Sequence, residues 1–65
     1  GICMSYGEGI AWARKERGLS QEQFAKEMGV KRYIVSAIET GQREPSELFI
    51  KMACNVLEVD EEDIA

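Results

Sequence analysis

The chain has 65 residues, of which 45% are hydrophobic, and a formal net charge of −4 at pH 7. This length allows one domain close to the smallest size that folds alone, and the apolar content excludes a disordered chain. No apolar run approaches the roughly 20 residues of a membrane span, and there is no signal-peptide pattern. We therefore expect one soluble, cytoplasmic domain over residues 1–65.

The chain opens with four residues, Gly-Ile-Cys-Met, that fit either a disordered end or a cloning remnant followed by a natural start at Met4. Ser5 and Glu8 then have the spacing of a capping box, which predicts a first helix over residues 6–17. Gly18 ends that helix. Its inward positions are Ile10, Ala13 and Arg14.

Residues 20–40 have the pattern of two short helices joined by a glycine turn. Ser20 and Gln23 form a second capping box, and Gly29 stands where a helix end favours positive φ. Apolar residues recur at helical spacing on both sides of the turn, at Phe24, Ala25, Met28, Val30, Val35 and Ile38. This helix-turn-helix pattern predicts one helix over residues 21–28 and, after the turn, a recognition helix over residues 31–40 that can enter a DNA major groove.

The remaining residues predict two more helices. Ser46 caps a helix over residues 47–57, and Asp60 caps a last short helix over residues 61–64 or beyond. The apolar stripe of the longer helix is Phe49, Ile50, Ala53, Cys54 and Leu57. We therefore predict an all-α fold, a compact bundle of about five short helices.

Acidic residues are concentrated at the end of the chain. Five of the twelve acids lie in the last eight residues, whereas residues 1–57 carry eight bases and seven acids. The acidic end can face away from a nucleic acid, but the remaining charge is only weakly basic and predicts modest non-specific affinity.

No cofactor, metal or catalytic site is expected. The chain has no histidine, and Cys3 and Cys54 are too far apart for a zinc site. We expect both to be free thiols, with Cys54 packed between helices, although a disulfide remains an alternative. The carboxylates at 60–63 lack the spacing of a calcium loop and fit a solvated helix start better.

An ordered set of residues from 10 to 64 resembles the Cro/repressor-type (lambda-repressor-like, XRE) helix-turn-helix family. The residues that carry the resemblance are Gly18-Leu19-Ser20-Gln21, Phe24-Ala25, Met28-Gly29-Val30, Val35-Ser36, Ile38-Glu39, Gly41, Pro45-Ser46, Ala53-Cys54, Leu57 and Val59. The resemblance implies a transcriptional regulator, of the phage or bacterial repressor type, that binds double-stranded DNA. One domain reads a half-site, so we expect a homodimer on a near-palindromic operator.

Outward positions near the start of the recognition helix are the expected base contacts: Arg32, Tyr33, Ser36 and Ala37. The expected phosphate contacts are Gln21, Lys31, Gln42 and Arg43. For Gln21 the alternative is an exposed glutamine without a role. Lys31 replaces the usual Ser or Thr cap, which costs the helix about 1 kcal/mol.

Arg14 lies on a face that is otherwise apolar. Either it covers apolar surface with its stem, or, as the resemblance implies, it pairs with Glu39 and ties the first helix to the recognition helix.

Three residues depart from the family pattern. Glu58 replaces a usual glycine, which predicts a less tight turn. Trp12 is expected either to be covered by Tyr6 or Ile2 or to contact another protein. Ile34 either touches thymine methyls or marks a protein contact.

The sequence does not identify the dimer surface, for which the candidates are Leu57, Val59, Ile64 and Trp12. Two other functional interpretations also stand. The chain could be a protein-interaction module, such as an antitoxin-type subunit, or a fragment of a larger regulator. Salt-dependent DNA affinity distinguishes the interaction module from the DNA-binding regulator.

Overall fold

The computed structural model describes residues 6–64, which form five α-helices. They are α1 (Tyr6–Glu16), α2 (Gln21–Met28), α3 (Arg32–Glu39), α4 (Glu47–Leu57) and α5 (Glu61–Ile64). The predicted all-α fold is confirmed, and each predicted helix differs from the observed one by at most one residue at either end. The predicted cap Ser5, Cys3 and residues 1–4 lie outside the described residues.

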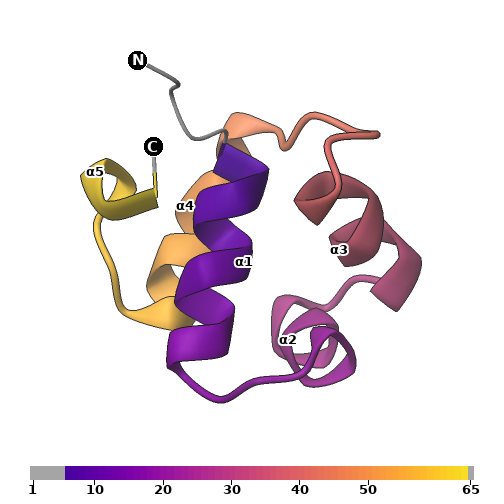
Figure 1. Ribbon diagram of the computed structural model, residues 1–65, viewed down its shortest axis with the longest axis horizontal. Helices are drawn as coiled ribbons and strands as arrows, with labels where there is room; N and C mark the ends of the chain where they lie inside the picture. Colours follow the sequence, from indigo (N-terminus) through magenta and orange to yellow (C-terminus); the bar gives the residue numbers. More distant parts are fainter. Residues whose placement is uncertain (1–5, 65) are drawn as a thin grey trace.

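In Figure 1 α1 lies in front of α4, with α5 on one side and α2 and α3 on the other, and α4 packs against α1, α2 and α5. The domain is small, with a longest extent of 33 Å. Among the helices in residues 6–64, none combines the length and the apolar character that a membrane crossing requires.

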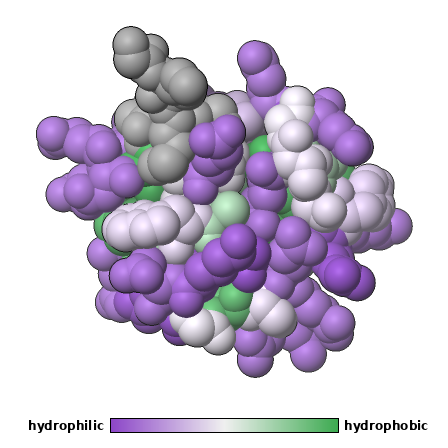
Figure 2. Space-filling view, in the orientation of Figure 1, coloured by the Kyte–Doolittle hydropathy of each residue, from purple (hydrophilic) through white to green (hydrophobic). Residues whose placement is uncertain are grey.

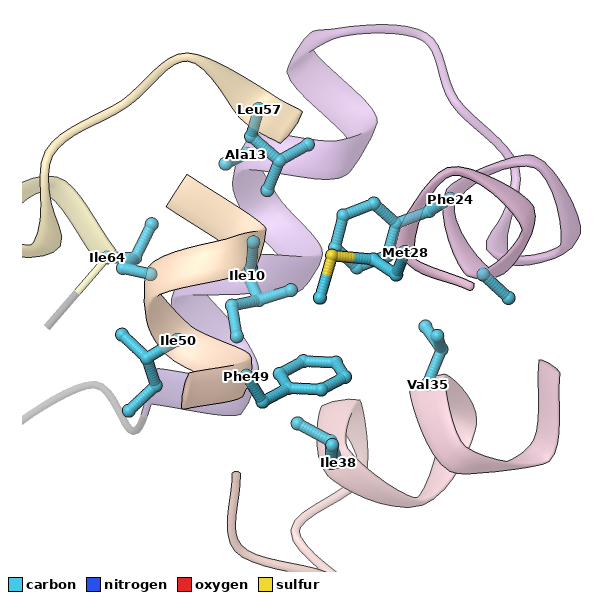
Figure 3. Close-up of a cluster of buried hydrophobic side chains, with 12 residues drawn as sticks. Ile10, Ala13, Phe24, Met28, Val35, Ile38, Phe49, Ile50, Leu57 and Ile64 are labelled. Atoms are coloured by element: carbon cyan, nitrogen blue, oxygen red, sulfur yellow. The ribbon is translucent and has the colours of Figure 1, made fainter. Parts of the chain in front are cut away.

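The core takes side chains from all five helices (Figure 3). Its largest fully buried members are Phe24, Ile10, Leu57, Ile64 and Val35. Because α2 and α3 contribute Phe24 and Val35 to the same core as α1, apolar burial holds the helix-turn-helix in place within the domain.

This core corrects the candidates for a dimer surface. Leu57 and Ile64 are 1% and 0% exposed, and Val59 packs partly buried against the core. These three side chains therefore stabilise the fold of a single chain, and Ile64 reaches the core because α5 packs against α1. Trp12 is 51% exposed and Tyr6 is exposed as well, so the expected cover by Tyr6 is wrong, while Ile2 lies outside the described residues.

Two glycines let α1 approach its neighbours closely. A Cβ atom at Gly7 would lie 2.0 Å from the carbonyl oxygen of Ile38, and one at Gly9 would lie 2.0 Å from that of Ile64. Glycine within a helix normally destabilises it. At these two positions the absence of a side chain lets the backbone of α1 contact the backbones of α3 and α5.

The caps of α2 form as predicted. Ser20 Oγ accepts from the Gln23 backbone N–H at 3.0 Å, and Gln23 Oε1 accepts from the Ser20 N–H at 2.9 Å. Gly29 ends the helix with a φ of 72°. Both ends of α2 are therefore fixed by local sequence.

The expectation of a looser turn at Glu58 is wrong. Glu58 adopts the left-handed conformation, with φ 56° and ψ 45°, and its backbone N–H donates to the Cys54 carbonyl. The Val59 N–H donates to the same carbonyl at 3.0 Å. The turn is as tight as a glycine turn, and the backbone of Glu58 bears the strain of that conformation.

Cys54 is a free, half-buried thiol that packs against the core, as expected. Burial, together with the nearby carboxylates of Glu61, Asp60 and Asp63, raises the pKa of the Cys54 thiol. The thiol is therefore held in its protonated, less reactive form.

Candidate nucleic-acid interface

α3 separates an inward apolar face from an outward polar face. Val35 and Ile38 are 0% and 3% exposed, whereas Lys31, Arg32 and Tyr33 are exposed. Because α3 makes one turn every 3.6 residues, Tyr33 points away from Val35 and Ile38. Arg32 and Lys31 are exposed at the first position of the helix and just before it.

The outward face brings together three of the four predicted base contacts. Arg32, Tyr33 and Ser36 line one shallow hollow on the surface of α3. Tyr33 is 64% exposed, and Ser36 and Ala37 are half-buried. A guanidinium, a phenol and a hydroxyl are thus grouped on a convex helix of the width that a major groove admits.

Lys31 begins α3 without capping it. Its backbone is extended, with φ −80° and ψ 149°, and its side chain makes no capping hydrogen bond. The structure therefore contains the uncapped helix start that the sequence predicts, with an exposed lysine beside it.

Arg14 and Glu39 form a nearly buried ion pair between α1 and the end of α3. Arg14 Nε donates to Glu39 Oε2 at 2.7 Å, and Nη2 donates to Oε1 at 3.0 Å. The third guanidinium nitrogen, Nη1, donates to the Leu19 carbonyl at 2.7 Å. The arginine therefore connects α1 both with α3 and with the loop that precedes α2. The pair that the resemblance implies is present.

Gln21 belongs to the same network, which the sequence did not indicate. Its Nε2 donates to Glu39 Oε1 at 3.0 Å, so its amide is held at the first turn of α2. The glutamine is half-buried rather than fully exposed. The network fixes the start of α2 relative to the end of α3.

The loop after α3 presents the other predicted phosphate contacts. The backbone N–H groups of Gln42 and Arg43 donate to the Ala37 carbonyl at 2.9 and 3.2 Å. Both side chains are exposed. Arg43 and Glu44 line the same two hollows, so the positive charge of Arg43 is partly offset.

Ile34 lies at the edge of α3 rather than on its outward face. It is half-buried, packs against the core, and lines a hollow together with Val30 and Phe49. Its contacts within the domain account for the apolar side chain at this position.

The charge is distributed as the sequence predicts. α5 carries Glu61, Glu62 and Asp63 and lies on the opposite side of α1 from α3 (Figure 1). Hydrophilic residues cover much of the face shown in Figure 2, with smaller apolar areas between them. Within residues 6–64, no cluster of three or more His, Cys, Asp or Glu side chains is arranged to hold a metal ion.

Comparison with known proteins places these features in context. The model of a family described as helix-turn-helix matches residues 10–64. The chain is 38% identical over 60 residues to the uncharacterized HTH-type transcriptional regulator YazB of Bacillus subtilis (strain 168), covering 92% of this chain and 87% of YazB.

Two solved structures share the fold. The restriction-modification controller protein C.AhdI of Aeromonas hydrophila superposes with a TM-score of 0.86 at 29% identity, over 95% of this chain and 94% of C.AhdI. SinR, the master regulator for biofilm formation, crystallised in complex with DNA, superposes with a TM-score of 0.80 at 33% identity. That match covers 88% of this chain and 92% of the SinR chain.

Proposed function

The chain belongs to the helix-turn-helix family, and we propose that it is a sequence-specific DNA-binding transcriptional regulator. The observation that carries the proposal is the outward face of α3, where Arg32, Tyr33 and Ser36 line one hollow on a helix whose other face is buried in the core. Similarity to YazB and SinR supports the same function.

In this mechanism α3 enters the major groove and its side chains contact base edges. Arg32 donates two hydrogen bonds to O6 and N7 of a guanine, and the Ala37 methyl meets a thymine methyl. Tyr33 and Ser36 donate to base edges or phosphates beside them.

Phosphate contacts set the position of α3 in the groove. Gln21 at the start of α2 and Lys31 before α3 contact one stretch of backbone, and Gln42 and Arg43 contact another. The Glu39 carboxylate holds Gln21 in place through its 3.0 Å hydrogen bond. These contacts supply most of the affinity without specifying sequence.

A single domain reads one half-site, so the regulator acts as a homodimer and represses transcription from a near-palindromic operator. The two α3 helices then lie about 34 Å apart, one turn of DNA.

The test is fluorescence-anisotropy binding to randomised duplex DNA at two salt concentrations, followed by sequencing of the bound fraction. We expect affinity to fall steeply with salt and a two-fold symmetric motif to be enriched. Absence of binding at low salt would contradict the proposal and favour a protein-interaction module. Salt-dependent binding without an enriched motif would support DNA binding but not sequence-specific regulation.

A further inference from the structure

The outer face of α4 has a patch that the core and the α3 surface leave unused. Leu48 is 67% exposed and Met52 is 40% exposed, and they lie one helical turn apart. Two large apolar side chains at i and i+4 share one helix face and form a continuous apolar surface. We define this surface, with Glu47 and Lys51 beside it, as the α4 patch.

Opposite charges border the apolar pair. Lys51 Nζ lies 3.5 Å from Glu47 Oε1, and both side chains are largely exposed. The patch thus has two apolar side chains, one acid and one base within two turns of one helix. Such a surface is self-complementary, because an antiparallel copy places Glu47 of each chain near Lys51 of the other.

We propose that the α4 patch is the contact surface for a second copy of this chain on DNA. Leu48 and Met52 of the two copies pack against each other across a two-fold axis, and beside them Glu47 of each copy lies near Lys51 of the other. This inference rests on the proposed function, which requires two copies to read two half-sites.

The position of the patch leaves the proposed DNA-binding surface accessible. The patch contains no α3 residue, so it leaves the outward face of α3 free for DNA.

The patch is small compared with a stable interface, which buries roughly 800 Å² per partner. We therefore expect weak self-association in free solution and cooperative association on DNA, where the two half-sites hold the copies together. The measurable quantity is the ratio of affinity for a duplex with two half-sites to affinity for a duplex with one.

The experiment uses duplexes derived from the motif that the wild-type chain selects. We expect Leu48→Glu to lower the affinity ratio about tenfold, because it places two like charges at the centre of the contact. Trp12→Glu, at a similarly exposed apolar residue on α1, is the matched control and should leave the ratio unchanged. An unchanged ratio in Leu48→Glu, or a loss confined to Trp12→Glu, would overturn the inference.

A charge exchange makes the test specific for contact between copies. Glu47→Lys and Lys51→Glu should each lower the ratio, because each gives copies whose patches repel one another. An equimolar mixture of the two variants should restore it, since a positive patch then meets a negative one. An affinity ratio of the mixture that is no higher than that of either variant alone would overturn the inference.

The same assay separates failure of the surface from failure of the proposed function. If the wild-type chain binds neither duplex, the proposed function itself is wrong, and this inference with it. If it binds both duplexes with no cooperativity, DNA binding stands and the α4 patch is not a dimer contact.

Discussion

Gln21 and Glu39 are joined by a hydrogen bond of 3.0 Å between Nε2 and Oε1, on the same carboxylate that receives Arg14. One carboxylate therefore connects α1, the first turn of α2 and the last turn of α3. Glu39 belongs to the last turn of α3, and Gln21 is a proposed phosphate contact. The network therefore links the stability of the fold to the geometry of the proposed DNA-binding surface.

We expect Arg14→Met to destabilise the domain strongly. The change leaves Glu39 as a buried carboxylate without its cation, and breaking such a pair costs about 3–5 kcal/mol. Urea unfolding measures the free energy change. The control is Arg17→Met, which removes the exposed pair with Glu58 and should cost about 0–1 kcal/mol. Equal losses in the two variants would contradict the structural role of the Arg14–Glu39 pair.

Replacement of Glu58 by glycine should stabilise the domain. Glu58 has a φ of 56°, and relief of this conformation should outweigh the loss of its exposed pair with Arg17 by about 0.5–1 kcal/mol. Thermal unfolding of Glu58→Gly should therefore occur at higher temperature than that of the wild type. Glu58→Ala removes the same ion pair without relieving the backbone, and a melting temperature equal to that of Glu58→Gly would refute the explanation.

Gly9→Ala should destabilise the domain, although alanine favours an isolated helix by about 1 kcal/mol. The new Cβ would lie 2.0 Å from the Ile64 carbonyl oxygen and must push α5 away from α1. The free energy of unfolding, measured for Gly9→Ala and for the wild type, gives the sign of the effect. A chain shortened before α5 provides the control, because the same substitution in that background should stabilise α1. Stabilisation of the full chain would contradict the close approach of α1 and α5.

For Lys31→Ser we expect stability and DNA binding to change in opposite directions. Serine restores the missing cap of α3 and should add about 1 kcal/mol of stability. Loss of the phosphate contact should weaken binding to all sequences and lower the salt slope by about 1. Chemical unfolding and a salt titration measure the two effects. An unchanged salt slope would remove Lys31 from the phosphate contacts.

The fold was largely predictable because its boundaries are encoded locally. The Ser20–Gln23 capping box and Gly29 determine both ends of α2, and Ser46 determines the start of α4, through bonds within a few residues. The apolar spacing of Val35 and Ile38 likewise gave the orientation of α3.

Tertiary contacts were less accessible to sequence reasoning. The burial of Ile64 depends on α5 folding back onto α1, and the Gln21–Glu39 hydrogen bond joins residues 18 positions apart. Gly9 did carry a signal, because a glycine beside core residues of a helix indicates close approach of another backbone. Glu58 misled because its side chain type suggested a different turn, whereas its backbone adopts the left-handed conformation and its N–H donates to the Cys54 carbonyl.

The most direct test of the account is sequence selection with Arg32→Ala beside the wild-type chain. We expect Arg32→Ala to weaken binding to the selected operator by about 1–3 kcal/mol and to relax the preference at one position in each half-site. Tyr33 and Ser36 remain in this variant, so the rest of the motif should persist. Equal weakening on every sequence would make Arg32 a phosphate contact, and an unchanged motif and affinity would contradict base reading by α3.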